Sequence, residues 1–97
     1  EAANLEAIVV DYSPRRFHET TMRVDTLSKM KNLKLLRLCS DMKFSGNLNY
    51  LSNELGYLTW HKYPFNFLPQ CFQPHKLFEL YLSWSNIKQL WEGTQVV

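Results

Sequence analysis

Apolar residues recur along this chain on a spacing that fits neither a single helix nor a single strand. The template L-x-x-L-x-L begins at Leu33, at Leu55 and at Leu77, so consecutive copies lie 22 residues apart, with Trp60 as the last apolar residue of the middle copy. A weaker copy begins at Leu5, 28 residues before Leu33. One amphipathic helix or strand would hold one period throughout. The chain is therefore predicted to repeat one structural unit, with an insertion between about residues 14 and 27.

This template and period are the signature of the leucine-rich repeat, in which each unit supplies one short strand and a looser return segment. A single unit cannot bury its apolar positions, and neighbouring units must stack to cover them. The pattern predicts an α/β solenoid of about four repeats. It would be curved, with short parallel strands on its concave face and loops and short helices on its convex face. We expect the strands near residues 5–11, 33–39, 55–61 and 77–83.

The first return segment is predicted to contain a short helix on the outer side. Leu27, Met30 and Leu33 lie at helical spacing within residues 20–32, and Asp25 or Thr26 is a suitable N-cap. Upstream, the proline at position 14 cannot donate to a strand ladder and is expected to mark the exit from the first strand. The helix would account for the longer spacing before Leu33.

The later return segments differ from one another. In residues 40–50, Lys43 takes the place that Phe65 and Ile87 hold downstream, and Phe44 is the residue that could fill the gap. The next return segment contains prolines at positions 64, 69 and 74. Proline removes a backbone donor and restricts the residue before it, so this segment is predicted to be extended or built of tight turns.

Side chains alternate between the two faces of a strand, so residues between the template positions should lie on the concave face. Three columns across the strands are expected: Ala7, Leu35, Tyr57, Glu79; then Val9, Arg37, Thr59, Tyr81; then Asp11, Cys39, His61, Ser83.

A candidate protein-binding surface follows from these columns. Its residues are Leu35, Arg37, Tyr57, Thr59, His61, Glu79, Tyr81, Ser83 and Trp84, with Lys62 as a further extension. Tyrosines beside charged side chains form the mixture that is enriched at protein interfaces. The alternative is that Tyr57 and Tyr81 serve only cross-strand packing.

Length and charge narrow the classes of function. Ninety-seven residues form one domain, 1–97, and the hydrophobic share of 45% is sufficient for a packed core. The chain is expected to be part of a longer solenoid, because it stops two residues before the next template leucine would fall. The net charge of +2 is spread along the chain, which argues against nucleic acid as a partner. No apolar run approaches the length needed to cross a bilayer, and no basic flank precedes the N-terminal apolar stretch, so no membrane association is expected.

Candidate chemistry is sparse. The sequence contains no nucleophile elbow, phosphate loop or H-E-x-x-H motif, and the chain is predicted not to be an enzyme and to bind no cofactor. His61 and Cys39 fall on adjacent strands, but two ligands are too few for a zinc site. Glu54, Glu79 and Glu92 are expected to be single surface charges. Trp60 and Trp91 are expected to belong to the core or to the packing between repeats.

Cysteine usage and glycosylation signals favour a reducing compartment. Cys39 and Cys71 fall in different parts of the repeat and form no C-x-x-C pair, so free thiols are predicted. None of the seven asparagines begins an N-x-[ST] acceptor. Both features indicate the interior of a cell.

Three stretches carry a resemblance to a known family: KMKNLKLLRL, LNYLSNELGYLTWHKYP and LPQCFQPHKLFELYLSWSNIKQLWEG. With their W-x-x-Y-P, L-P-x-x-F-x-P and L-W-E-G runs, they resemble the opening leucine-rich repeats of plant intracellular immune receptors of the TIR, nucleotide-binding and leucine-rich repeat type. The irregular run CSDMKFSGN departs from the pattern. The resemblance implies a non-enzymatic recognition and regulatory segment in the cytoplasm, or also in the nucleus. Its partner would be a pathogen effector protein, the receptor's own nucleotide-binding domain, or both.

Two other functions fit the repeat pattern. A leucine-rich substrate adaptor of a ubiquitin ligase would present targets to an enzyme elsewhere, and a structural spacer would contact only its own upstream domains. The W-x-x-Y-P and L-W-E-G runs favour the immune receptor over the adaptor. A phosphate-binding G-x-x-x-x-G-K-[ST] loop upstream would make the same distinction.

Overall fold

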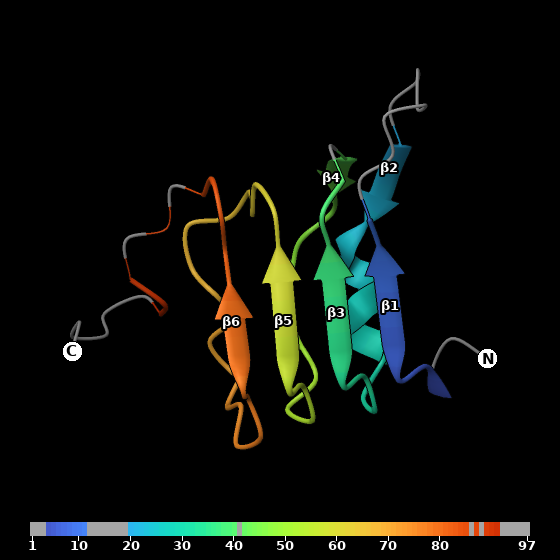
Figure 1. Cartoon of the computed structure of the whole chain (residues 1–97), viewed down its shortest axis with the longest axis vertical. Helices are drawn as coiled ribbons and strands as arrows, with labels where there is room; N and C mark the ends of the chain where they lie inside the picture. Colours follow the sequence, from blue (N-terminus) through green and yellow to red (C-terminus); the bar gives the residue numbers. More distant parts are fainter. Residues whose placement is uncertain (1–3, 12–19, 41, 86, 88, 92–97) are drawn as a thin grey trace.

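Two parallel sheets form the framework of the computed structural model, which describes residues 4–11, 20–40, 42–85, 87 and 89–91. The larger sheet contains four strands in the order β1-β3-β5-β6 (Figure 1). Their bounds are Ala7–Val10 for β1, Leu35–Leu38 for β3, Tyr57–Trp60 for β5 and Glu79–Tyr81 for β6. A second sheet pairs β2, Thr20–Arg23, with β4, Met42–Ser45. Each strand of the larger sheet lies within one of the ranges expected from the template.

The strands of the larger sheet pair in the register that the 28- and 22-residue spacings predict. Leu36 lies opposite Ile8 on one side and opposite Leu58 on the other, and Leu58 lies opposite Leu80. The backbone ladder continues past the strand ends, where the His61 N–H donates to the Leu38 carbonyl at 2.8 Å. Equivalent template positions are therefore neighbours in space.

The hydrophobic core lies on one face of this sheet. On β3 and β5 the inward side chains Leu36, Leu38, Leu58 and Trp60 are fully buried. Arg37 and Tyr57, which alternate with them along the strands, point to the other face and are exposed. Burial is incomplete at the outer strands, where Ile8 and Leu80 are only partly covered. Within the larger sheet, the fully buried side chains therefore lie on the two central strands.

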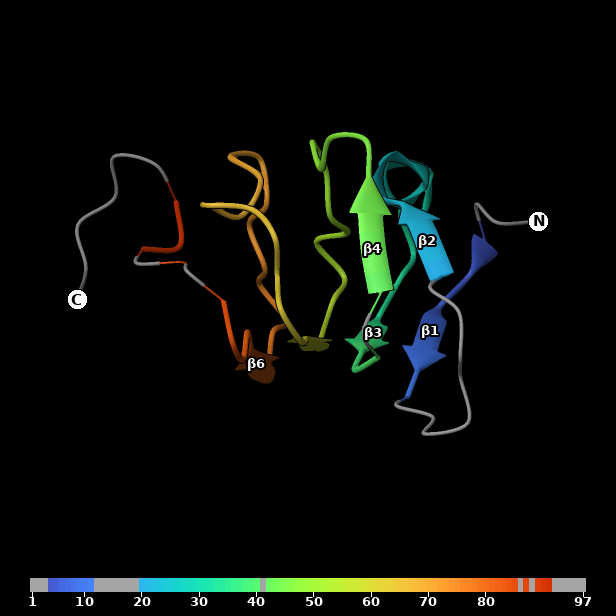
Figure 2. The same ribbon diagram turned by 90° about the horizontal axis from the view of Figure 1, so that it is seen from above.

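The return segments cover the other side of the core. Viewed from above, the larger sheet lies along one side of the molecule, and β2, β4 and the loops lie along the opposite side (Figure 2). Leu68 and Phe72 of the third return segment are buried against the core. The segment between β5 and β6 contains turns and no helix or strand, in agreement with its prolines.

The expected helix at residues 20–32 is shorter and of a different type. Thr20–Arg23 forms β2, and a 3₁₀ helix, η2, spans Val24–Lys29. The predicted N-caps Asp25 and Thr26 are wrong, since both lie inside η2 and the cap residue is Arg23, without a side-chain cap bond. Thr20–Arg23 pairs with β4 as a strand, so these four residues cannot form the first turn of the expected helix. The buried Val24 and Leu27 fit the three-residue period of a 3₁₀ helix. The proline exit at position 14 lies outside the described residues.

The irregular residues 40–50 contain β4. Lys43 is exposed, and the Phe44 ring packs on Trp60 with ring centroids 5.1 Å apart, which confirms that Phe44 fills the gap left by the lysine. After the strand, Gly46 adopts a left-handed backbone with φ +85°. A β-carbon there would lie 2.5 Å from Asp25 Oδ1, so the turn requires glycine both for its backbone and for space.

Candidate protein-binding face

The face of the larger sheet that points away from the core is called the outer face below. It consists of the predicted columns, Ala7, Val9, Asp11, Leu35, Arg37, Cys39, Tyr57, Thr59, His61, Glu79, Tyr81 and Ser83, together with Phe78 and Trp84 at the ends of β6. Of the nine residues predicted as a binding surface, Arg37, Tyr57, Glu79, Tyr81, Ser83 and Trp84 are exposed, and Leu35, Thr59 and His61 are half-buried. The structure therefore brings all nine to one side of the sheet or to its border.

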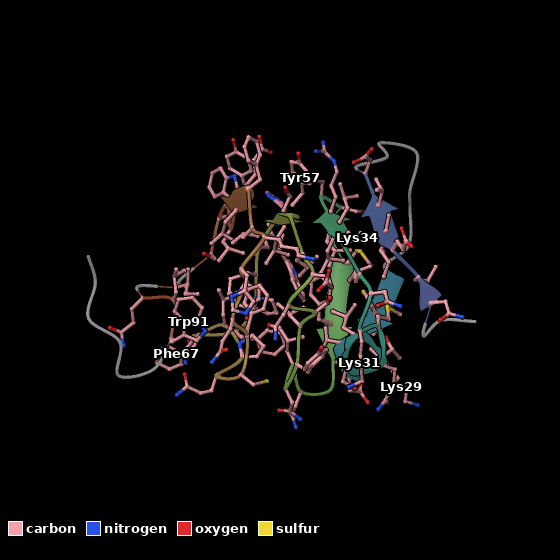
Figure 3. The ribbon with its side chains drawn as sticks, turned by 90° about the horizontal axis from the view of Figure 1, so that it is seen from below. Lys29, Lys31, Lys34, Tyr57, Phe67 and Trp91 are labelled. Atoms are coloured by element: carbon pink, nitrogen blue, oxygen red, sulfur yellow. The ribbon has the colours of Figure 1, made fainter. Side chains whose placement is uncertain are left out.

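Aromatic side chains gather at the β5 and β6 end of the outer face. Tyr57 is 44% exposed, Tyr81 57% and Trp84 81%. Phe78, which the sequence reasoning missed, is 76% exposed, and its ring meets that of Tyr57 edge to face at 5.7 Å. Figure 3 shows Tyr57 on this face, with aromatic side chains above β6 beside it. Exposed rings at this density are typical of interaction surfaces.

Phe78 could have been found from the repeat itself. It occupies the position before the strand that Lys34 and Gly56 hold in the preceding copies, and its N–H donates to the Gly56 carbonyl at 2.7 Å. An apolar ring at a position that otherwise holds lysine or glycine is a signal of an exposed aromatic residue.

The β1 and β3 end of the outer face is charged and internally neutralised. Arg37 Nε donates to Asp11 Oδ1 at 2.7 Å, across the strand pair. This hydrogen bond is the main cause that raises the pKa of the Arg37 guanidinium. Both side chains are more than half exposed, so the pair contributes little to stability. A partner could therefore form an ion pair with Arg37 only by competing with Asp11.

The turns that follow β5 and β6 have the same backbone conformation. Lys62 and Trp84, 22 residues apart, both have a left-handed backbone, with φ of 61° and 58°. Lys62 N–H donates to the Ser83 carbonyl at 2.8 Å, and His61 Nδ1 lies 3.2 Å from Ser83 Oγ. The repeated turn places Trp84 at the border of the outer face, where its ring is almost fully exposed.

Ion pairs follow the opposite border, where the strands begin. Lys76 Nζ donates to Glu54 Oε1 at 2.7 Å, and Lys34 Nζ lies 3.6 Å from Glu6 Oε1. The prediction that Glu54 is a single charge is therefore wrong, and Glu92, included in that prediction, lies outside the described residues. The hydrogen bond from Lys76 lowers the pKa of the Glu54 carboxyl, with a smaller lowering from the charge of the same lysine. These residues line a shallow hollow at the strand entrances, together with Ala7, Leu35, Gly56 and Tyr57.

The two tryptophans predicted as core are packed as expected. Trp60 is fully buried and meets Tyr63 edge to face at 4.9 Å. Trp91 Nε1 donates to the Pro69 carbonyl at 3.0 Å and is partly buried. Both indoles belong to the packing between the sheet and the return segments.

Within the residues that the structure describes, no three His, Cys, Asp or Glu side chains are grouped closely enough to hold a metal ion. Cys39 and Cys71 are free thiols. In the same part of the chain, no helix has both the length and the apolar character to cross a membrane. The exposed aromatic side chains make the outer face the candidate site.

The chain is homologous to segments of plant disease resistance proteins. It is 34% identical to the disease resistance protein RRS1 of Arabidopsis thaliana over 99 residues, which cover 94% of this chain and 8% of that protein. It is 44% identical to RPP2A of Arabidopsis thaliana over 67% of this chain and 6% of that protein. It is 47% identical to RUN1 of Vitis rotundifolia over 68% of this chain and 4% of that protein.

These matches span only a small part of each relative, between 4% and 8% of its length. The chain matches no family model, and no solved structure matches it.

Proposed function

We propose that the chain is a leucine-rich repeat segment of a plant intracellular immune receptor, in which it recognises protein. Three features support the proposal: the homology to plant disease resistance proteins, the 22-residue template, and the exposed aromatic end of the outer face. The last of these carries the functional part, because the few residues that dominate binding energy at protein interfaces are enriched in tyrosine and tryptophan.

In this proposal the strands form the concave side of a solenoid of about four repeats, and stacked repeats bury the template residues. The segment has no enzymatic activity and no cofactor. Its partner is a pathogen effector, the receptor's own nucleotide-binding domain, or both in turn, and it acts in the cytoplasm or nucleus. Recognition and autoinhibition would use the same surface.

The experiment that tests the proposal compares two double variants of the full-length receptor in leaf tissue. Tyr57→Ser with Tyr81→Ser alters the outer face, and Asn66→Ser with Gln70→Ser alters exposed residues of the return segment. At equal protein levels, we expect the tyrosine variant to change the cell-death response, either by losing effector sensitivity or by gaining constitutive activity. The return-segment variant should respond as the unaltered receptor does. Unchanged output from the tyrosine variant would contradict the proposal.

A further inference from the structure

Glu79, a carboxylate of the outer face, forms no ion pair with another described residue. Among the described residues, four carboxylates form ion pairs: Glu6 with Lys34, Asp11 with Arg37, Asp25 with Arg23 and Glu54 with Lys76. Glu79, on the edge of the described sheet, is exposed and is the one described carboxylate without such a pair. The Asp11 and Arg37 charges cancel, so Glu79 is the unpaired carboxylate of the outer face among the described residues.

Two tyrosines flank Glu79 on the same face of the sheet. Tyr57 lies opposite Glu79 in the strand register, and Tyr81 lies two residues further along the same strand and so on the same face. Adjacent strands are about 4.8 Å apart, so the Tyr57 and Glu79 side chains leave the sheet side by side. Phe78 closes the strand-entrance side by packing edge to face on Tyr57. The carboxylate therefore projects from an apolar, aromatic frame that is itself exposed.

This combination selects for a planar cation. The face of an aromatic ring attracts a cation through its quadrupole, and a carboxylate accepts two parallel hydrogen bonds from a guanidinium. Arginine can satisfy both at once, because its guanidinium stacks on a ring while its fork of donors meets the carboxylate. The ammonium of lysine is more strongly hydrated and lacks the fork, and an acidic side chain would be repelled.

We propose that the Tyr57, Phe78, Glu79 and Tyr81 cluster, called the aromatic-acid cluster below, binds an arginine side chain presented by a partner protein. The inference rests on the proposed function, since it names the chemistry that the outer face would recognise. Trp84, at the exit of the same strand, extends the apolar surface on which the partner backbone around that arginine can lie.

The test uses four capped peptides of the sequence Gly-Ser-X-Ser-Gly, in which X is arginine, lysine, citrulline or glutamate. Each is titrated into the isotopically labelled chain and followed by nuclear magnetic resonance. The arginine peptide should shift the signals of the aromatic-acid cluster and leave those of Gln70 and Asn66 unchanged. Citrulline keeps the shape and removes the charge, so we expect binding at least about tenfold weaker, with lysine in between and glutamate without effect.

Two variants test whether the Glu79 carboxylate binds the arginine peptide. Glu79→Gln keeps the side-chain shape and should weaken the arginine peptide by about tenfold or more, because the charge-assisted hydrogen bonds are lost. Glu6→Gln is the matched control: it removes the same charge from an exposed glutamate that precedes β1, at the other end of the sheet, and it should change binding far less than Glu79→Gln does. Both variants should retain the spectrum of the folded chain, since both side chains are exposed.

Equal binding of all four peptides, tighter binding of the glutamate or lysine peptide, or full binding by Glu79→Gln would overturn the inference. The failure of the proposed function is a separate result. If the arginine peptide does not bind while the tyrosine double variant still changes the cell-death response, the outer face recognises protein by other chemistry. If the peptide binds and that response is unchanged, the arginine site stands and the receptor function fails.

Discussion

Neighbouring residues on one strand have opposite roles in this molecule. On β5, Leu58 points into the core and is fully buried, whereas Tyr57 points outward and is 44% exposed. Because side chains alternate along each strand, the inward side chains stabilise the fold and the outward side chains are available for binding. This assignment can be tested residue by residue.

Leu58→Ala should remove packing from the middle of the core and lower the free energy of unfolding by about 2–5 kcal/mol. Tyr57→Ser should lower it by about 1 kcal/mol or less, because Tyr57 lies on the outer face and is not part of the buried core. Leu80→Ala should cost less than Leu58→Ala, since Leu80 is only partly buried. Urea midpoints measure all three. A tyrosine variant as damaging as the Leu58 variant would mean that the two faces are assigned the wrong way round.

Tyr63 links stability to alkaline pH. It is buried, its hydroxyl donates to the Phe67 carbonyl at 2.7 Å, and burial raises the pKa of its phenol above the ordinary value. The folded state therefore favours the neutral phenol. This contribution is complete below about pH 10 and is lost as the pH rises from there towards the folded-state pKa.

Tyr63→Phe should cost about 1 kcal/mol at neutral pH, because the Phe67 carbonyl loses its donor. Above about pH 10 the difference from the unaltered chain should shrink, because the variant has no phenol to ionise at this site. Tyr57→Phe, at an exposed position, should keep the alkaline loss of the unaltered chain. Urea midpoints between neutral and alkaline pH provide the comparison, and parallel pH profiles for the unaltered chain and Tyr63→Phe would refute the assignment.

At the scale of elements, the turn after β4 depends on the contact between Gly46 and Asp25. Gly46→Ala should lower the free energy of unfolding by about 1–3 kcal/mol, because alanine is strained at a positive φ and its β-carbon meets the Asp25 carboxylate. Gly56→Ala is the matched control, with ordinary contacts of 3.5 Å and 3.8 Å to backbone oxygens and an expected change within about 1 kcal/mol.

Adding Asp25→Ala to Gly46→Ala should recover part of the loss, because the carboxylate no longer occupies the space of the new β-carbon. The backbone strain at position 46 would remain. Thermal midpoints of the two single variants and the double variant give the coupling energy. Strict additivity would show that η2 and the β4 turn are not in contact in solution.

The strands of the larger sheet were predictable because the sequence carries two signals for them. Apolar and polar residues alternate within the strands, and the template recurs every 22 residues. β2 and β4 lie outside the template and therefore lack the second signal. Each is four residues long, and the two strands pair with one another. Leu27 and Met30 are at helical spacing and are buried. Because β2 pairs with β4 up to Arg23, only the six residues Val24–Lys29 remain for the helix, and they form a 3₁₀ helix. Tertiary pairing overrides local preference in such short segments.

The candidate site was predictable to the same extent. The columns and their exposed face follow from the register, so Tyr57, Glu79 and Tyr81 were identified from sequence. The ion pairs of Arg37 and Glu54 were not, because they join residues 26 and 22 positions apart through side-chain conformations. Glu79 stands out only once the pairing of the other carboxylates is known.

At the scale of the whole molecule, burial falls from the centre of the sheet to its edges. Core side chains on β3 and β5 are fully buried, and those on β1 and β6 are partly exposed. Amide hydrogen exchange should therefore be slowest in β3 and β5 and faster in β6, whose opening disrupts the fewest packed side chains. Equal protection of β5 and β6 would show that the partly covered residues Leu80 and Leu82 are sheltered by something outside the described chain.

The central claim is that the outer face, and no other side of the molecule, meets a protein partner. Site-specific photo-crosslinking tests it most directly: p-benzoylphenylalanine replaces Tyr57, Tyr81, Asn66 or Gln70 in turn in the full-length receptor, and adducts are mapped after irradiation in leaf tissue. We predict protein crosslinks from positions 57 and 81, to an effector or to another domain of the receptor, and none from positions 66 and 70. Protein crosslinks from positions 66 or 70, or none from positions 57 and 81, would contradict the account.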